Sequence, residues 1–341
     1  MCFRLAPQGS TRASHIEAIA DDLALALHVE SVLVRPIPAE GCVGIFVPIP
    51  PDEIEMVLWR DLLSPTIQSK RQVLPLCLGV DWLGTPFSDD LSALPHLLVA
   101  GSTGSGKSVL MRSIVASIIY NGSAKLVLSD TKGVEFTEFV SSPSIWGGVG
   151  GEIATTPLRT IEQMDLLCQE TDRRLKSYGV NGCRNIGEAN QRFFNQPDPY
   201  IILVIDELAD IVDLPLEKGR ARKIGADKLD YLTRKARAAG IHVIAGTQRP
   251  SVDTVRGVIK ANFTSRLAFK TASAIDSKVI LDEVGAEHLL ERGDMLYKSP
   301  NFPGLLRLHS GYASSADIKG ALEFANYSRT INLLDAGETR Q

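Results

Sequence analysis

Apolar and polar positions alternate in two different ways along the chain, and the first 90 residues show the less regular pattern. Between residues 16 and 27 apolar side chains recur at helical spacing, and Ser14 with Glu17 forms a capping-box pair that predicts where this helix begins. Two runs rich in β-branched residues, 31–36 and 43–49, predict strands joined by a turn that contains Pro and Gly. The other predicted elements are a helix at 53–63 and a strand at 73–80. Together they predict a small α+β domain over residues 1–90.

From residue 91 onward, strand-length apolar runs alternate with longer amphipathic stretches, of which residues 158–178 form the clearest helix. The apolar runs contain few polar positions, which is typical of strands that helices cover on both faces. The predicted strands are residues 96–100, 124–130, 200–206, 241–247 and 263–269. This order predicts an α/β domain with a central, mostly parallel sheet over residues 91–326, followed by a polar C-terminal tail over 327–341.

Composition restricts the class of protein. The 341 residues include 36 Lys and Arg against 40 Asp and Glu, a net charge of −4, and 44% of them are hydrophobic. Such a composition supports a folded core and excludes a disordered chain. The five cysteines are scattered without a CxxC pair, so neither a disulfide framework nor a zinc site is indicated. Because the chain is acidic overall, a nucleic-acid partner has to be inferred from local features.

The chain shows no signal for a membrane or for export. No apolar run approaches the roughly 20 residues that a membrane-spanning helix needs. The first residues also lack the charged and apolar regions of a secretory signal. We therefore expect a cytoplasmic protein without direct membrane insertion.

Residues 101–108 read GSTGSGKS and match the phosphate-binding pattern G-x-x-x-x-G-K-S in full. A predicted strand leads into this segment and helical spacing follows it, which is the context that the pattern requires. The glycines allow backbone N–H groups to surround a polyphosphate at the positive end of the following helix. Lys107 would contact the β- and γ-phosphates of ATP, and Ser108 would ligate Mg²⁺. The candidate nucleotide-binding residues are Gly101, Ser102, Thr103, Gly104, Ser105, Gly106, Lys107, Ser108 and Val109.

A second apolar strand ends in two carboxylates, Asp206 and Glu207. Asp206 would hold the Mg²⁺ shell, and Glu207 would orient and deprotonate the attacking water. An exposed strand end could carry the same residues, but the phosphate-binding loop about 100 residues earlier favours a catalytic pair. Gln248 follows another strand and would contact the γ-phosphate and the water. We therefore expect ATP hydrolysis, with Lys107, Glu207 and Gln248 as catalytic residues.

Five segments together resemble the motor of the FtsK/SpoIIIE DNA translocases, in the HerA/FtsK superfamily of P-loop ATPases. They are PHLLVAGSTGSGKS (95–108), YIILVIDELAD (200–210), KARAAGIHVIAGTQRPSVD (235–253), IKANFTSRLAF (259–269) and GDMLY (293–297). The resemblance implies that residues 1–90 correspond to the small alpha domain of that family and residues 91–326 to its RecA-like ATPase domain. It also implies a ring, typically a homohexamer, that pumps double-stranded DNA through its pore without sequence preference, with ATP and Mg²⁺ as cofactors.

In related hexameric ATPases the active sites lie at subunit interfaces, and an arginine shortly before the sensor glutamine acts in trans. By its position in the motif, the resemblance assigns this role to Arg237. Such an arginine contributes about 10³–10⁵ in rate by stabilising charge on the transferred phosphoryl group. Arg266, in the segment TSRLAF, is the other candidate. An internal salt bridge on its strand is the alternative explanation of Arg266.

Two sets of basic residues are candidates for contact with DNA. The first set is Lys218, Arg220, Arg222 and Lys223, in a position where the family has a pore loop, and the second is Arg249, Arg256 and Lys260. Contacts of these side chains with phosphates would be independent of sequence and dependent on salt. A solvated basic loop is the simpler explanation of the first set.

The chain departs from the family at two points. Thr131 stands in an Asp-Thr-Lys turn where FtsK-type motors often have Asp-Pro-Lys, so we expect the rigidity of this turn to differ. The membrane domain and the DNA-reading winged helix of full-length members have no counterpart in this sequence. We therefore expect neither septal anchoring nor direction finding by sequence.

Two other functions fit the same motifs. One is an FtsK-like ATPase of a protein-export or conjugation system, and the other is a nucleotide-dependent switch without processive translocation. The intact catalytic set argues against an inactive ATPase. The identity of any adaptor protein is not encoded in these motifs.

Overall fold

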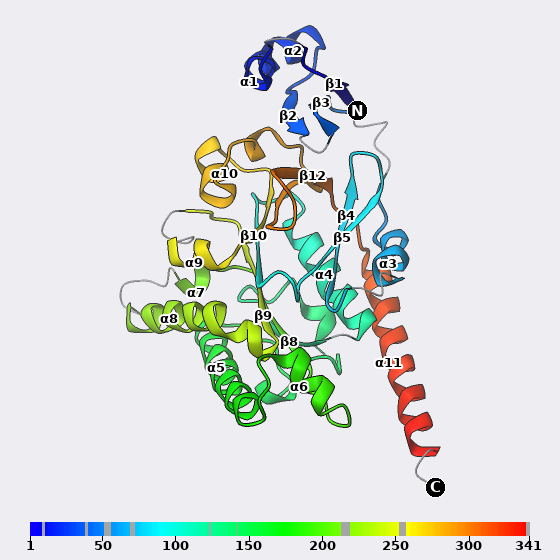
Figure 1. Ribbon diagram of the computed structural model, residues 1–341, viewed down its shortest axis with the longest axis vertical. Coiled ribbons are helices and arrows are strands. Elements are labelled where there is room, and N and C mark those ends of the chain that lie inside the picture. The colour runs from blue at the N-terminus through cyan, green and yellow to red at the C-terminus, as the bar shows by residue number, and fades with distance from the viewer. Residues whose placement is uncertain are drawn as a thin grey trace.

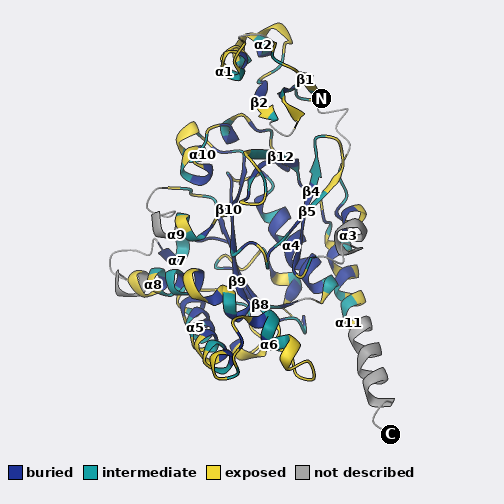
Figure 2. Ribbon diagram, in the orientation of Figure 1, coloured by how far each residue is buried: buried dark blue, intermediate teal, exposed yellow. Residues whose placement is uncertain are grey.

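The computed structural model describes residues 1–8, 11–37, 40–50, 56–68, 72–122, 124–140, 142–212, 219–251 and 257–338. Within these residues the chain forms two β-sheets, one of three strands at the N-terminus and one of nine strands that makes up the body of the molecule (Figure 1). Buried residues concentrate along the strands of the larger sheet and on the helix faces against it (Figure 2). The predicted α/β class is confirmed.

The N-terminal domain is an antiparallel sheet in the order β1-β3-β2, with two short helices beside it. Its elements are β1 (Cys2–Leu5), α1 (Ala13–Glu17), α2 (Ala20–Ala26), β2 (Leu33–Ile37) and β3 (Cys42–Phe46). Ile16, Val34 and Val43 form part of its core. The capping-box prediction was wrong. Arg12 is the N-cap of α1 and no side chain caps the helix, because Ser14 already lies inside the first turn.

The nine-stranded sheet has the order β5-β4-β12-β11-β10-β6-β9-β8-β7. Its strands are β4 (Pro75–Asp81), β5 (Pro86–Asp90), β6 (His96–Ala100), β7 (Ala124–Ser129), β8 (Tyr200–Ile205), β9 (Ile241–Thr247), β10 (Ser265–Phe269), β11 (Asp294–Lys298) and β12 (Leu305–His309). The five strands from β10 to β7 are parallel, and they are the five that the apolar runs predicted. The other four pair antiparallel and extend the sheet beyond β10.

Helices cover both faces of the parallel strands. The chain passes from β6 to β7 in one direction along the sheet and returns through β8 to β9 in the other. Since such crossovers are right-handed, α4 (Lys107–Asn121) lies on one face, and α5 (Pro157–Val180) and α8 (Gly219–Lys235) lie on the other (Figure 1). The remaining helices are α3 (Trp59–Gln68), α6 (Ile186–Arg192), α7 (Ala209–Val212), α9 (Gly257–Asn262), α10 (Ala274–Leu281) and α11 (Ser315–Glu338). No helix among the described residues is long and apolar enough to span a membrane.

Two helices, α5 and α11, show how the helix ends compare with the sequence pattern. Thr156 caps α5 by accepting a hydrogen bond from Arg159 N at 3.2 Å, and Pro157 occupies the first helical position. The backbone of α11 continues as helix to Glu338, through most of the segment predicted as a polar tail. Its first half packs on α4, where Phe324 stacks on Tyr120.

The division between the two sheets does not fall at the predicted boundary near residue 90. β4 and β5 belong to the nine-stranded sheet, so the N-terminal sheet ends with β3. The apolar pattern of β4 could not reveal this, because it specifies a buried strand but not the sheet that the strand joins. The two sheets meet through an apolar contact in which Leu33 and Phe46 pack near Leu289 and Leu296. Arg35 adds a hydrogen bond to Val284 O across this contact.

Candidate nucleotide site

The phosphate-binding loop lies where the parallel strands end. β6 ends at Ala100, and its neighbours β9 and β10 end at the same edge of the sheet. Between β6 and α4 the backbone has positive φ at Gly104 (82°) and at Gly106 (112°), a region that glycine adopts without strain. Gly106 is the N-cap of α4, so the free N–H groups of the first helical turn lie at the loop.

Close packing also requires glycine at two positions of this loop. A Cβ on Gly101 would lie 2.6 Å from Phe269 Cβ, and a Cβ on Gly106 would lie 2.9 Å from Gly293 N. Gly293 N donates to Ser105 O at 2.9 Å. The turn that precedes β11 therefore supports the loop directly, and a side chain at either glycine would displace it.

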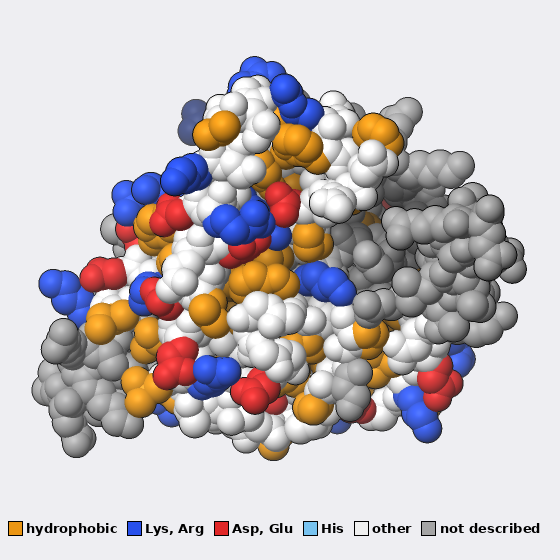
Figure 3. Space-filling view, turned by 90° about the horizontal axis from the view of Figure 1, so that it is seen from below, with side chains coloured by type: hydrophobic (Ala, Val, Ile, Leu, Met, Phe, Trp, Pro, Cys, Tyr) orange, Lys and Arg blue, Asp and Glu red, His pale blue; other side chains and the backbone are white. Residues whose placement is uncertain are grey.

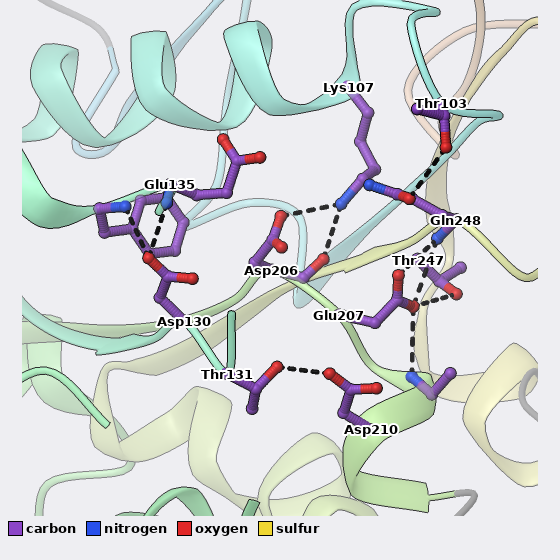
Figure 4. Close-up of polar contacts among 12 residues, drawn as sticks. Thr103, Lys107, Asp130, Thr131, Glu135, Asp206, Glu207, Asp210, Thr247 and Gln248 are labelled. Atoms are coloured by element: carbon purple, nitrogen blue, oxygen red, sulfur yellow. Dashed lines mark hydrogen bonds and ion pairs between the residues drawn. The ribbon is translucent and has the colours of Figure 1, made fainter. Parts of the chain in front are cut away.

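Lys107 and Asp206 form a buried ion pair beneath the loop (Figure 4). The ammonium of Lys107 donates to Asp206 O at 2.7 Å and to Asp206 Oδ1 at 2.9 Å. Because an ammonium has three N–H donors, one remains for a phosphate oxygen. β9 approaches this pair at Gly246, where a Cβ would lie 2.4 Å from Asp206 O and 3.0 Å from Lys107 Nζ. The structure thus brings together two residues that the sequence separates by about 100 positions.

The other carboxylate oxygen of Asp206 is suited to a cation. Asp206 Oδ2 is buried and has no hydrogen-bond partner among the described residues. Leaving a buried carboxylate oxygen unpaired is costly, so a ligand at this atom would be stabilising. Mg²⁺ usually takes one or two protein oxygens and completes its shell with phosphates and water. Ser108 borders the cleft above, so the donor set fits Mg²⁺ that arrives with a nucleotide.

The described residues contain no group of three or more His, Cys, Asp or Glu side chains that could hold a metal without such a nucleotide.

Neutral donors hold the carboxylate of Glu207 at the ends of β8 and β9 (Figure 4). It accepts hydrogen bonds from Thr247 Oγ1 at 2.8 Å, from Gln248 N at 3.1 Å and from Ala209 N at 3.4 Å. The side chain is only 5% exposed. These contacts orient the carboxylate without an ion pair, so its charge remains available to accept a proton. No sequence motif distinguishes Thr247, although it directly precedes Gln248 at the strand end.

Gln248 joins the phosphate loop to Glu207. Its side-chain oxygen accepts a hydrogen bond from Thr103 Oγ1 at 3.2 Å, while its backbone N–H donates to Glu207. Thr103 belongs to the loop that would surround the phosphates. Gln248 is therefore the one residue between the loop and the carboxylate of Glu207 in this chain of hydrogen bonds.

A cleft of about 1100 Å³ lies over the loop. Residues 102–104, 106–109 and Gln248 line one part of it. The N-terminal domain lines another part with residues 28–30 and 48–50. Residues 56–57 and the segments 290–292 and 309–312 complete the lining among the described residues. A cleft of this size accommodates a nucleoside triphosphate.

A polar network supports the neighbouring loop after β7. Asp130 is buried and accepts hydrogen bonds from the backbone N–H groups of Gly133, Glu135 and Phe136. Thr131 donates its hydroxyl to Asp210, the acidic residue at the start of α7 (Figure 4). A proline at position 131 could not make this bond. The departure from the family turn therefore adds a link between this loop and the segment that carries Glu207.

The structure does not bring Arg237 to the nucleotide site of its own chain. Arg237 lies in the 3₁₀ helix η5 (Ala236–Ala239), just before β9 begins. The phosphate loop lies at the opposite end of β9, about 20 Å away for a strand of seven residues. The Arg237 side chain is exposed and donates to Ala93 O at 2.9 Å. Any catalytic role of Arg237 would therefore be at the site of a second chain.

Arg266 has internal partners instead. Its guanidinium donates to the carbonyl oxygens of Phe263, Ile280 and Lys260 and pairs with Asp282 at 2.5 Å. Only 8% of Arg266 is exposed. These contacts correspond to the alternative explanation, an internal salt bridge on the strand.

Lys260, a candidate for DNA contact, belongs to the same ion-pair cluster. Its ammonium lies 2.5 Å from Asp282 and donates to Lys278 O at 3.1 Å. Lys223 and Arg249 are exposed. Lys218 and Arg256, and the side chains of Arg220 and Arg222, lie outside the described residues.

Two family models match this chain. The model described as the FtsK/SpoIIIE family matches residues 58–252, and the model described as the FtsK alpha domain matches residues 1–49. The interval between the matches coincides with the division between the two sheets. A DNA translocase FtsK of Helicobacter pylori is 38% identical over 337 residues, which cover 96% of this chain and 38% of that protein. The chain therefore spans about two fifths of the length of this relative.

Solved structures share the fold. The pCW3 conjugation coupling protein TcpA, in a monomer form with ATPgS, has a TM-score of 0.70 at 26% identity, covering 94% of this chain and 88% of that one. The cytoplasmic domain of the type VII secretion ATPase EccC of Thermomonospora curvata has a TM-score of 0.61 at 22% identity, covering 73% and 31%. The predicted P-loop ATPase fold is confirmed.

Proposed function

Because the chain belongs to the FtsK/SpoIIIE family, we propose that it is an ATP-driven translocase of double-stranded DNA. The observation that carries the proposal is the convergence of Lys107, Asp206, Glu207 and Gln248 at one edge of the sheet. A site that only bound nucleotide would not need an oriented carboxylate beside the phosphate loop. The name of the relative from Helicobacter pylori supports DNA as the substrate of the motor.

In the proposed reaction a water molecule attacks the γ-phosphorus and the bond to the β-phosphate oxygen breaks. Glu207, held by Thr247 and by the N–H of Gln248, accepts the proton of that water. Lys107 donates its free N–H to the phosphates, and Asp206 offers its unpaired oxygen to Mg²⁺. When bound, Mg²⁺ offsets negative charge on the phosphates.

Completion of the site by a second copy of the chain is part of this proposal. Arg237 lies at the edge of the sheet opposite its own phosphate loop, and its side chain is exposed. If Arg237 supplies charge to the transferred phosphoryl group, it does so in a neighbouring subunit. We therefore propose a ring, with six subunits as in the motors that the sequence resembles.

Lys223 and Arg249 are the described candidates for contact with DNA. Neither side chain has an ion-pair partner among the residues that the structure describes, in contrast to Lys260. On the face seen in Figure 3, basic and acidic side chains are interspersed, so the visible described residues there form no continuous basic surface. We propose that DNA instead contacts the elements at the carboxyl edge of the sheet. Contacts to phosphates alone would make binding independent of sequence.

The test is the ATPase rate with and without long linear duplex DNA at low salt, in the presence of Mg²⁺. We expect duplex DNA to raise the rate of the wild-type protein and Lys107→Ala to abolish both rates. Displacement of a triplex-forming strand from the same duplex measures movement separately. A wild-type rate that is unaffected by duplex DNA would refute the translocase proposal.

The likeness to TcpA favours a second setting for the same activity, DNA transfer in conjugation, because the match covers most of both chains. Plasmid transfer frequency from donor cells that carry Lys107→Ala in place of the wild type tests this setting. Unchanged transfer with unchanged expression would exclude it.

A further inference from the structure

The strand order indicates which way a bound nucleotide would lie in the cleft. β9 and β8, which precede Gln248 and Glu207, lie on one side of β6, and β10 and β11 lie on the other. The γ-phosphate has to lie on the side of Glu207 and Gln248, where water is activated. A bound nucleoside triphosphate therefore extends its nucleoside toward the turn before β11 and the N-terminal domain.

The lining of this part of the cleft is suited to a flat, apolar group. Its described apolar residues come from both domains, and they include Val29, Ile49, Met56, Val57, Leu290 and Tyr312. Ligand sites are commonly lined by such side chains together with a few polar groups. A nucleobase is the part of ATP that fits this lining, because the loop and Lys107 already bind the phosphates in the proposed function.

Two residues in unusual backbone conformations also line the cleft. In the described part of the chain, the residues other than glycine with positive φ are His28 (54°), Arg292 (63°) and Asp282 (65°). Asp282 caps α10 and pairs with Arg266, which accounts for it. His28 and Arg292 line the cleft, one from each domain. His28 follows the C-terminus of α2, where Val29 N donates to Ala24 O at 3.0 Å, so helix capping accounts for its conformation as it does for Asp282. No helix ends at Arg292, and a left-handed conformation of such a residue carries strain and is concentrated at functional sites.

The side chains of His28 and Arg292 are exposed. Neither makes a side-chain hydrogen bond or ion pair to another residue within the described ranges. The backbone beside Arg292 is also held against the phosphate loop, because the next residue, Gly293, donates its N–H to Ser105 O. The packing of Gly106 against Gly293 holds the same turn close to the loop. An unpaired guanidinium is thus positioned at the nucleoside end of the site.

We propose that the base of ATP binds between the N-terminal domain and the turn at Arg292, and that Arg292 and His28 stack on it. A planar guanidinium and an imidazole ring both pack well on the face of a purine. The proposal rests on the proposed use of ATP and adds a base subsite shared by the two domains. As a consequence, the N-terminal domain contributes to nucleotide affinity, and occupancy by ATP stabilises its contact with the ATPase domain.

The experiment compares two probes, ATP and inorganic tripolyphosphate, by calorimetric titration in the presence of Mg²⁺. Tripolyphosphate occupies the loop but has no base. We expect Arg292→Ala and His28→Ala each to weaken ATP binding about tenfold and to leave tripolyphosphate binding unchanged. Alanine at position 292 keeps the unfavourable backbone conformation, so the change isolates the guanidinium.

Arg184→Ala and His15→Ala are the matched controls. Both side chains are exposed, and neither borders the cleft. Unchanged ATP affinity in Arg292→Ala and His28→Ala would overturn the proposal. An equal loss for ATP and tripolyphosphate would also overturn it, because the residues would then act on the phosphates or on the fold.

A third comparison separates this proposal from the translocase function. If wild-type protein binds ATP more tightly than tripolyphosphate, and the two variants lose that advantage, the base subsite is supported whether or not duplex DNA stimulates hydrolysis. If DNA stimulates hydrolysis but ATP and tripolyphosphate bind the wild type equally, the function stands and the subsite does not.

Discussion

The two edges of the parallel strands differ in how many contacts the candidate site residues make within one chain. At the carboxyl edge, Lys107 pairs with Asp206, and Glu207 accepts a hydrogen bond from the N–H of Gln248. Asp206 Oδ2 and Ser105 Oγ are buried there without a hydrogen-bond partner among the residues that the structure describes. At the amino edge, Arg237 projects from η5 with one backbone contact. Under the proposed function, one chain preassembles the residues for hydrolysis, whereas Arg237 would stabilise charge only at the site of a second copy.

The largest effect is expected at the amino edge. Arg237→Ala should lower DNA-stimulated hydrolysis by about 10³-fold or more while leaving ATP affinity nearly unchanged. Mixtures of Arg237→Ala and Lys107→Ala subunits should recover part of the activity, because each variant supplies what the other lacks. The ATPase rate across mixing ratios measures this.

Arg266→Ala is the matched comparison for Arg237→Ala. Loss of its guanidinium leaves buried carbonyl oxygens unpaired, so the free energy of unfolding should fall by about 1–3 kcal/mol. Urea unfolding measures the loss, and mixing with Lys107→Ala should restore nothing beyond the residual activity. Complementation by Arg266→Ala but not by Arg237→Ala would reverse the assignment of the two arginines.

At the carboxyl edge, Glu207→Gln should lower the hydrolysis rate by about 10²–10⁴-fold and retain nucleotide binding. The amide has nearly the same shape but cannot accept the proton of the attacking water. Single-turnover hydrolysis and a titration with ATP separate the two effects. Loss of ATP binding together with hydrolysis would show that Glu207 supports the loop instead.

A smaller effect is expected at Thr247, whose hydroxyl orients Glu207 at 2.8 Å. Thr247→Val keeps the shape and removes the donor, so the hydrolysis rate should fall about tenfold, the equivalent of one hydrogen bond. Thr247→Ser retains the hydroxyl and serves as the control. Equal rates for the valine and serine variants would mean that the remaining donors suffice.

The smallest change is a dependence of stability on pH that originates at the amino edge. Burial, reinforced by the neighbouring His242, lowers the pKa of His96 to about 3, and burial lowers the pKa of His242 to about 4. In the unfolded chain both titrate near 6.5, so below that pH the unfolded state binds more protons than the folded state. The free energy of unfolding should therefore fall as the pH decreases from 6.5 toward 4, by at most about 1.4 kcal/mol per pH unit for each histidine.

Urea unfolding at several pH values tests this dependence. His96→Gln should reduce the slope, and His15→Gln, at an exposed position, should leave it unchanged. A slope that neither substitution alters would place the titrating groups elsewhere.

Much of the site could be predicted because its motifs are local. The phosphate loop is a contiguous segment in which the backbone geometry requires glycine. The strand that leads to Asp206 and Glu207 is apolar throughout because it is buried on both faces. Neighbouring parallel strands end at the same edge of a sheet, so these segments were expected to meet. The contacts of Thr247 and Thr103 were not expected, because a threonine near a strand end has no distinctive pattern.

The amino-acid sequence by itself determined the α/β class, the parallel strands, the phosphate loop and the carboxylates, since each depends on periodicity or on residues adjacent in the chain. Only the tertiary structure decided which sheet β4 and β5 join, that Arg266 is internal while Arg237 is exposed, and that His28 and Arg292 border one cleft. Those outcomes depend on packing between segments up to about 260 residues apart. Burial of apolar surface drives that packing. Because it is non-directional, the sequence pattern does not specify which segments come together.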